Sequence, residues 1–123
     1  MLIAYMSLTG NVRDFVERLG FETIEINHSN PLINTEKDYI IVTPTYDVDI
    51  TEPINEFIEY KSNIKHLKGI VGSGNYNFDD LYIFTAKNLS DKYNVPLIYG
   101  FELLGTDRDV TNLKEELGKF AIT

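Results

Sequence analysis

The sequence contains no cysteine. The chain therefore cannot form disulfides, thiolate nucleophiles or thiolate metal sites, which excludes the phosphatases and phosphotransferases that use cysteine. It also has no apolar run long enough to cross a membrane, and no basic-then-apolar signal at its N-terminus. From these absences we expect a protein that acts in the cytoplasm and binds no membrane.

Histidine is scarce as well, since only His28 and His66 are present. His28 falls in a polar loop and His66 just before Leu67-Lys68, so we expect both at the surface. Two surface histidines and no cysteine offer little side-chain chemistry for nucleophilic or acid–base catalysis. We therefore expect no catalytic side chain and no metal site, and assign any chemistry to a bound cofactor.

Positive charge is in short supply, because 11 Lys and Arg face 19 Asp and Glu, a formal net charge of −8. Such a chain repels polyanions, so we expect no nucleic-acid partner. A phosphate group bound to this protein would have to be held by neutral donors and helix dipoles. The acidic surface can steer the protein toward a basic patch on a partner, or it can serve solubility alone.

The apolar pattern predicts strands that alternate with helices along one domain, residues 1–123. The strands are expected at residues 1–6, 21–26, 39–42, 69–72 and 95–99. The helices are expected at residues 12–19, around 54–58, at 81–93, and at 110–120, with Phe120 on the apolar face of the last. This alternation predicts an α/β protein with a parallel sheet and helices on both faces. For a chain this short, we expect the three-layer flavodoxin-like sandwich with strand order 2-1-3-4-5.

The turn after the first strand has the composition of a phosphate site. Ser7 and Thr9 can donate O–H groups, Asn11 can donate N–H, and Gly10 allows a bulky anion to approach the backbone closely. The N-terminus of the following helix adds unpaired N–H groups and a positive dipole end. The same residue types also form ordinary helix N-caps, so the turn alone leaves both interpretations open.

Two further polar loops are expected beside this turn, because the carboxyl ends of parallel strands meet at one edge of the sheet. Residues 43–49 contain hydroxyl groups and Tyr46, and residues 72–78 contain two glycines, amides and two aromatic rings. Phosphate donors at one end and stacking faces with backbone donors at the other suit flavin mononucleotide, FMN. Taken singly, the aromatic residues could be hydrophobic cover and the glycines turn residues.

A phospho-acceptor receiver domain would share this fold but needs different residues. It requires an acidic pair after the first strand, an aspartate after the third and a lysine after the fifth. This chain has Met6-Ser7, Val42-Thr43 and Gly100-Phe101 at those places. The receiver function is therefore not expected.

Four segments resemble the NrdI family, the small flavodoxin-like activators of class Ib ribonucleotide reductase. They are residues 7–12, 71–78, 93–97 and 101–106, and the resemblance covers nearly the whole chain. It implies that the protein binds FMN, receives electrons from a flavin-reducing donor, and reacts in the reduced form with dioxygen. The oxidant, taken to be superoxide, would pass to the dimanganese site of the reductase small subunit, NrdF, which then forms its tyrosyl radical.

The resemblance also assigns roles to the three loops. Residues 7–11 would hold the FMN phosphate, residues 43–46 would flank the ring on one side, and residues 72–78 would face its pyrimidine and N5 edge. The residues expected to bind the cofactor are Ser7, Leu8, Thr9, Gly10, Asn11, Val12, Thr43, Pro44, Thr45, Tyr46, Asp47, Gly72, Ser73, Gly74, Asn75, Tyr76 and Phe78.

The chain departs from the family pattern in two places, where acidic residues replace glycines. Residues 47–50 read Asp-Val-Asp-Ile, and Asp79-Asp80 follow the Asn-Phe pair. A carboxylate of Asp47 or Asp49 beside the ring would disfavour an anionic reduced flavin and lower its potential. Two alternative functions remain, a generic short-chain flavodoxin that carries electrons between proteins, and a binding module that has lost its flavin.

Overall fold

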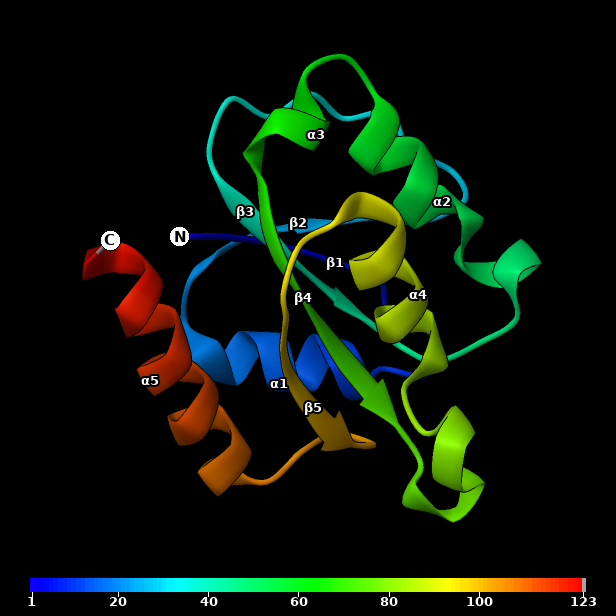
Figure 1. Cartoon of the computed structure of the whole chain (residues 1–123), viewed down its shortest axis with the longest axis vertical. Helices are drawn as coiled ribbons and strands as arrows, with labels where there is room; N and C mark the ends of the chain where they lie inside the picture. Colours follow the sequence, from blue (N-terminus) through cyan, green and yellow to red (C-terminus); the bar gives the residue numbers. More distant parts are fainter. Residues whose placement is uncertain (123) are drawn as a thin grey trace.

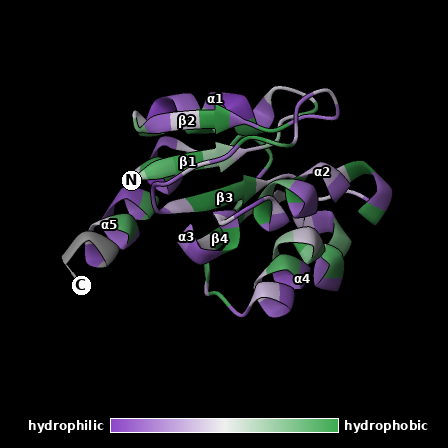
Figure 2. Ribbon diagram, turned by 90° about the horizontal axis from the view of Figure 1, so that it is seen from above, coloured by the Kyte–Doolittle hydropathy of each residue, from purple (hydrophilic) through white to green (hydrophobic). Residues whose placement is uncertain are grey.

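The chain is organised around a parallel five-stranded sheet, shown in Figure 1. The computed structural model describes the backbone of residues 1–122 and the side chains of residues 1–119. The strands are β1 (Leu2–Tyr5), β2 (Glu22–Glu25), β3 (Tyr39–Thr43), β4 (Leu67–Gly74) and β5 (Leu97–Glu102). Their order is β2-β1-β3-β4-β5, and every neighbouring pair is parallel, as predicted. Figure 2 shows β2, β1 and β3 side by side with their arrowheads in the same direction.

Helices cover both faces of the sheet. They are α1 (Asn11–Leu19), α2 (Val48–Glu59), α3 (Asn63–His66), α4 (Phe84–Tyr93) and α5 (Asp107–Ile122), with a 3-10 segment, η1, at Tyr76–Leu81. In Figure 1, α1 and α5 lie on one side of the sheet, and α2 and α4 lie on the other. The three-layer sandwich predicted from the sequence is thus confirmed.

Alternate residues of the central strands face the two helical layers. Ile3 packs with α1 and α5, whereas its neighbours Leu2 and Ala4 pack with α2 and α4. Ile40 and Ile41 of β3 divide between the two layers in the same way. Because both faces of these strands are covered, their sequences are continuously apolar rather than alternating.

Aromatic contacts close each layer. On one face, the Phe15 ring of α1 stacks on the Phe101 ring of β5, with centroids 3.8 Å apart. On the other face, the Tyr39 and Phe57 rings meet edge-on at 5.3 Å. Both contacts join elements that are distant in sequence. Phe101 lies near the carboxyl end of β5, where the polar loops are, whereas Tyr39 begins β3 at the opposite edge of the sheet.

Several element boundaries differ from the predicted ones. The second helix begins at Val48, so the loop after β3 covers only residues 44–47. The expected helix at 81–93 begins at Phe84, because the backbone at Asp79 and Ile83 is not helical. β5 runs from 97 to 102 rather than 95 to 99, and α3 is an additional short helix. The side chain of Phe120, expected in the core, lies outside the described residues.

Asn63 joins three segments at the amino-terminal edge of the sheet. It is fully buried, and its Oδ1 accepts the Thr35 N–H at 2.9 Å. Its Nδ2 donates to the Ile33 carbonyl at 2.7 Å and to the Phe57 carbonyl at 2.8 Å. One amide side chain therefore satisfies three backbone groups, which makes it a major contributor to stability.

Among the described residues, no helix has the length and apolar character needed to cross a membrane.

Candidate functional site

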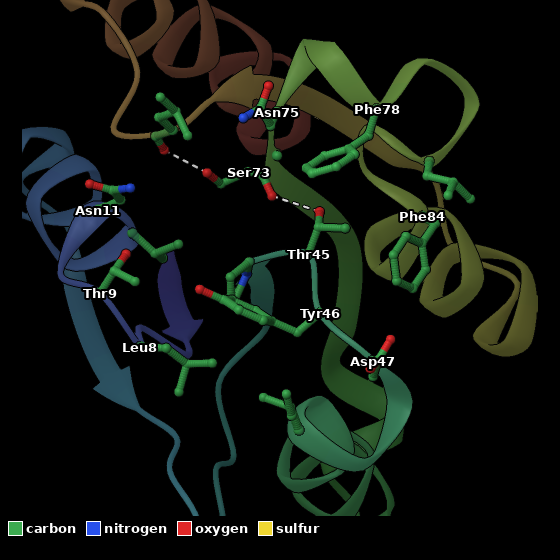
Figure 3. A pocket seen from close by; sticks show the side chains of 16 residues that line it. Leu8, Thr9, Asn11, Thr45, Tyr46, Asp47, Ser73, Asn75, Phe78 and Phe84 are labelled. Atoms are coloured by element: carbon green, nitrogen blue, oxygen red, sulfur yellow. Dashed lines mark hydrogen bonds between the residues drawn. The ribbon is translucent and has the colours of Figure 1, made fainter.

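A cleft of about 460 Å³ opens at the carboxyl edge of the sheet (Figure 3). It lies at the switch point where chain connections run in opposite directions from β1 and β3, the usual ligand position in such sheets. Its lining comes from the loops after β1, β3, β4 and β5, from the end of β4, from η1, and from the first turns of α1, α2 and α4. The lining residues are Leu8, Thr9, Asn11, Val12, Pro44, Thr45, Tyr46, Asp47, Ile50, Ser73, Gly74, Asn75, Phe78, Leu81, Phe84 and Leu103.

The first loop leads into the N-terminus of α1 through a left-handed residue. Gly10 is the N-cap, with φ of +94°, a conformation that glycine adopts without strain. Thr9 and Asn11 lie on the side of the cleft opposite Phe78 and Phe84 (Figure 3). The first-turn N–H groups of Asn11 and Val12 have no acceptor within the helix, so they remain free for a ligand.

Ser7 bonds to the first turn of α1. Its Oγ accepts the N–H of Arg13 at 3.2 Å, so it caps α1 from six residues away, and it does not line the cleft. The Arg13 guanidinium is paired with the Glu25 carboxylate, which also accepts the Tyr5 hydroxyl at 3.2 Å. No lysine or arginine is found among the described lining residues. An anion in this cleft would therefore meet neutral donors.

The second loop is tied to the strands and helix behind it. The Thr45 hydroxyl donates to the Ser73 carbonyl at 2.7 Å and contacts the Tyr82 carbonyl at 3.3 Å. The Tyr46 N–H donates to the Thr85 hydroxyl, which in turn donates to the Tyr46 carbonyl. Thr43 is fully buried and does not line the cleft.

The two acidic residues of this region are not equivalent. Asp47 is the N-cap residue of α2 and lines the cleft. Asp49 lies in the first turn of α2 and is exposed, but it does not line the cleft. Of the two carboxylates that the sequence places near the ring, only Asp47 borders the described cavity.

Three hydrogen bonds fasten the third loop to the end of β5. The Ser73 hydroxyl donates to the Leu103 carbonyl at 2.5 Å, and the Leu103 N–H donates to the Gly74 carbonyl at 2.9 Å. The Tyr76 N–H donates to the Glu102 carboxylate at 3.1 Å. The loop after β5 is therefore a fourth wall of the site, which the three-loop prediction did not include.

The glycines at the end of β4 allow the chain that enters α4 to pack against the strand. A Cβ at position 72 would lie 2.7 Å from the Ala86 Cβ, and a Cβ at position 74 would collide with the Tyr82 carbonyl oxygen. Gly72 is buried and does not line the cleft, whereas Gly74 does. Both positions require glycine for packing within the protein, independently of any ligand.

Tyr76 lies outside the cleft, contrary to expectation. Its side chain is 55% exposed, and its ring packs against that of Tyr82 with centroids 4.5 Å apart. Burial raises the pKa of the Tyr82 phenol above its ordinary value. Tyr76 therefore stabilises η1 rather than forming the cleft lining.

The structure thus brings together most of the predicted binding residues, and the assignment of each to a ligand stays a prediction. The predicted residues outside the lining are Ser7, Gly10, Thr43, Gly72 and Tyr76. The lining residues that sequence reasoning missed are Ile50, Leu81, Phe84 and Leu103. The first three were assigned to loop or helix core by their spacing. Leu103 follows a parallel strand at the same edge, and that topological rule could have found it.

Neither histidine lines the cleft. His28 is exposed, as expected. His66 is half-buried, and its Nδ1 lies 3.0 Å from Asp38 at the amino-terminal edge of the sheet. Within the described side chains, no cluster of three or more His, Cys, Asp or Glu residues is placed to hold a metal ion.

Asp79 has a strained backbone in the segment that borders the cleft. Its φ of +47° and ψ of −114° fall in a region that side chains disfavour and glycine tolerates. We expect Asp79→Gly to raise the free energy of unfolding by about 1 kcal/mol, since relief of strain exceeds the added entropy of the unfolded chain. Urea denaturation would measure the change.

Asp80→Gly is the matched control, because Asp80 is adjacent, acidic and exposed but has no positive φ. We expect Asp80→Gly to lower the free energy of unfolding by about 0.5 to 1 kcal/mol, the usual cost of added glycine flexibility. Equal losses in the two variants would show that the backbone at Asp79 is not strained.

A doubly wound parallel sheet with a cleft at its switch point, bordered by helix-terminal amides and aromatic rings, defines a flavodoxin-like protein. Comparison with known families narrows this class, because residues 3–115 match the family model described as NrdI Flavodoxin like. The chain belongs to the NrdI flavodoxin-like family. Membership implies a flavin cofactor and a redox role.

Curated relatives match over nearly the whole chain. Protein NrdI of Bartonella tribocorum is 35% identical, over 98% of this chain and 95% of its own length. Protein NrdI of Mycoplasma capricolum subsp. capricolum is 33% identical, over 97% of this chain and 81% of its own length. These extents agree with the family assignment and leave no large unmatched segment in this chain.

Solved structures share the fold at low identity. A short-chain flavodoxin associated with a PDU bacterial microcompartment superposes with a TM-score of 0.64 at 16% identity, covering 98% of this chain and 97% of that one. Oxidised flavodoxin 2 from Bacillus cereus superposes with a TM-score of 0.60 at 16% identity, covering 98% of this chain and 96% of that one. At this identity the similarity establishes the flavodoxin-like fold and nothing narrower.

Proposed function

We propose that this protein binds FMN in the cleft and acts as the flavin redox activator of a class Ib ribonucleotide reductase, in the cytoplasm. The observation that carries the proposal is a cleft at the switch point in a chain of the NrdI family. The family supports the redox role, and the chemistry of the lining supports the choice of FMN.

The lining fits FMN in size and in chemistry. A cavity of about 460 Å³ lies within the range of roughly 300 to 1,000 Å³ typical of small-ligand pockets. One side carries Thr9, Asn11 and the first-turn amides of α1, which suit a phosphate without requiring a cation. The other carries the Phe78 and Phe84 rings, with Tyr46 from the second loop, which suit a planar heteroaromatic group (Figure 3).

In this proposal each loop has a separate task. Residues 8–12 would bind the phosphate, and residues 44–47 would flank the ring. Residues 73–75 and Phe78 would contact its polar edge, and Leu103 would add apolar cover. When bound and reduced, the flavin would supply superoxide-type oxidant by passing an electron to dioxygen, for use at the dimanganese site of the small subunit NrdF.

The rim of the cleft supports docking of a protein partner. Phe78 and Leu81, which line the cleft, are 62% and 58% exposed, which is unusual for large apolar side chains. Asp47 and Asp79 add acidic groups at the same edge. We therefore expect the NrdF surface that meets this rim to be apolar at its centre and basic at its border, and the electron donor to compete for it.

A radical assay distinguishes the proposed reductase activator from a generic electron-carrying flavodoxin. NrdF loaded with manganese(II) would be mixed with dioxygen and with this protein in its reduced flavin form. The activator should generate the tyrosyl radical of NrdF, seen by electron paramagnetic resonance. A generic electron carrier would reduce other protein acceptors but leave NrdF without the radical, and that result would exclude the activator role.

The acidic second loop gives a prediction about the flavin potential. Asp47 borders the cleft, so its negative charge disfavours addition of further negative charge to the flavin on reduction. We expect Asp47→Asn to raise the midpoint potential by about 20 to 40 mV, a modest value because Asp47 is exposed and screened. Potentiometric titration of the two proteins would measure the shift.

Asp49→Asn is the control for the overall loss of one negative charge. Asp49 is exposed on the same helix but lies off the cleft, so its replacement should shift the potential by less than about 10 mV. Equal shifts in both variants, or none in Asp47→Asn, would contradict the placement of the ring beside Asp47.

A further inference from the structure

Thr85 is a buried polar side chain whose hydrogen bonds go to the second loop. It lies in the first turn of α4 and is only 5% exposed. The Tyr46 N–H donates to its Oγ1 at 3.1 Å, and its hydroxyl donates to the Tyr46 carbonyl at 3.0 Å. One hydroxyl thus satisfies both backbone polar groups of a single residue on another element.

This arrangement is unusual for a helical threonine. Such a hydroxyl commonly bonds back to a carbonyl of its own helix, whereas Thr85 reaches across to a loop nearly forty residues earlier. Tyr46 follows the end of β3 and precedes α2, so it belongs to neither ladder. Among the described residues, the bonds to Thr85 are the only hydrogen bonds of the Tyr46 backbone. Thr85 therefore supplies both hydrogen bonds of the Tyr46 backbone, whereas Thr45 and Asp47 on either side have anchors of their own.

Tyr46 borders two cavities. It lines the main cleft on one side, and it also lines a pocket of about 190 Å³ between α2 and α4 on the other. Phe84 and Thr85 contribute to that second pocket as well. Space is thus available behind Tyr46, into which its ring could move if its backbone were released. Holding the backbone keeps the ring at the cleft, where Figure 3 shows it.

We propose that Thr85 is a positioning residue for the cofactor site, whose hydroxyl fixes Tyr46 at the cleft and thereby sets flavin affinity and the environment of the ring. The inference rests on the proposed function for its ligand. Its structural half, the fixing of Tyr46, stands on the two hydrogen bonds and the burial of Thr85 and can be tested without flavin.

The test uses two substitutions at the same position. Thr85→Val keeps the shape of the side chain and removes the hydroxyl, while Thr85→Ser keeps the hydroxyl. Thr85→Val should weaken FMN binding about tenfold, because the Tyr46 ring is then no longer held at the cleft and must be ordered on binding. Thr85→Ser should stay within about threefold of the wild type. Bound flavin should also become more fluorescent in Thr85→Val, since a loosened Tyr46 ring quenches it less.

Thr35→Val is a closely matched control. Thr35 is 6% exposed, and its hydroxyl likewise accepts the N–H of one residue, Lys37, at 3.1 Å and contacts the same residue's carbonyl at 3.5 Å. It precedes β3, at the opposite end of that strand from the cleft. Thr35→Val should lower thermal stability as Thr85→Val does, but leave FMN affinity and flavin fluorescence unchanged.

A double-mutant cycle tests whether Thr85 acts through Tyr46. In a Tyr46→Ala background, Thr85→Val should change FMN affinity by less than about twofold, because the ring it positions is gone. The positioning role would be overturned if Thr85→Val weakened binding by the full amount in that background. It would equally be overturned if Thr85→Val lowered stability while affinity and fluorescence stayed at wild-type values.

Amide hydrogen exchange in flavin-free protein separates this inference from the proposed function. The Tyr46 amide should exchange at least about tenfold faster in Thr85→Val than in wild type or Thr85→Ser. Unchanged exchange would show that Thr85 does not hold the loop, whatever the ligand. Failure of the wild type to bind FMN would defeat the proposed function, while the exchange result would still decide the role of Thr85.

Discussion

Replacing Gly74 with alanine is expected to weaken FMN binding by at least about a hundredfold and to lower the free energy of unfolding by about 3 kcal/mol. The new Cβ would collide with the Tyr82 carbonyl oxygen and lie 3.1 Å from the Ile83 Cγ2. A backbone carbonyl cannot rotate away as a side chain can, so one of the two segments must move. Urea denaturation and FMN titration of the variant would measure both effects.

Movement at Gly74 would spread through the site because its neighbours are hydrogen-bonded together. The Tyr82 carbonyl lies 3.3 Å from the Thr45 hydroxyl, and the Gly74 carbonyl accepts the Leu103 N–H. A shift of either segment would therefore displace the walls formed by the second and fourth loops. This linkage is why we expect a larger effect on binding than overpacking alone would produce.

Gly118→Ala provides the control for the same chemical change. Gly118 lies in α5, and a Cβ there meets no described atom within 4 Å. This variant should bind FMN with wild-type affinity. Its free energy of unfolding should rise by about 0.5 to 1 kcal/mol, the usual advantage of alanine over glycine in a helix. If Gly74→Ala behaved like Gly118→Ala, the close packing of η1 and α4 on β4 would be wrong.

Substitution of Asn63 by aspartate is expected to cost about 3 kcal/mol of stability with little change in FMN affinity. The carboxylate would face the Ile33 and Phe57 carbonyls, which now accept hydrogen bonds from the Asn63 Nδ2 at 2.7 and 2.8 Å. The two carbonyls would lose their donor, and the buried negative charge would keep the Thr35 N–H but have no positively charged partner. Asn63 begins α3 at the edge of the sheet opposite the cleft, so the site itself should be undisturbed.

Asn88→Asp makes the same chemical change at an exposed position of α4. Its effect on stability should stay within about 0.5 kcal/mol. Chemical denaturation of the three proteins at pH 7 compares them directly. A loss of less than about 1 kcal/mol in Asn63→Asp would contradict the three-bond role of Asn63.

The sheet could be predicted from the sequence because burial leaves a direct pattern in it. The apolar runs that became β1 and β3 are covered on both faces, and the alternating residues of β2 lie at an edge. The start of α4 could not be predicted in this way. Its expected first turn is broken at Ile83, where packing of the chain against Gly72 and Gly74 overrides the helical spacing.

The sequence predicts the location of the candidate site in the fold better than it predicts which residues line it. Strand order alone brings the loops after β1, β3 and β4 to one edge, so most of their residues were found. The sequence could not separate the two interpretations of Ser7, because an N-cap hydroxyl and a phosphate donor have the same signature. In the structure its Oγ accepts the Arg13 N–H, and it does not line the cleft. Phe84 was missed because its spacing is that of a core helix residue, although it begins the helix beside the cleft.

Titration of flavin-free protein with FMN and with riboflavin, followed calorimetrically, tests the central claim most directly. The first-turn amides of α1, with Thr9 and Asn11, are proposed to hold the phosphate, which riboflavin lacks. We predict that a single FMN binds per chain, at least about tenfold more tightly than riboflavin. Absence of FMN binding, or equal affinity for the two flavins, would contradict the assignment of this cleft as an FMN site.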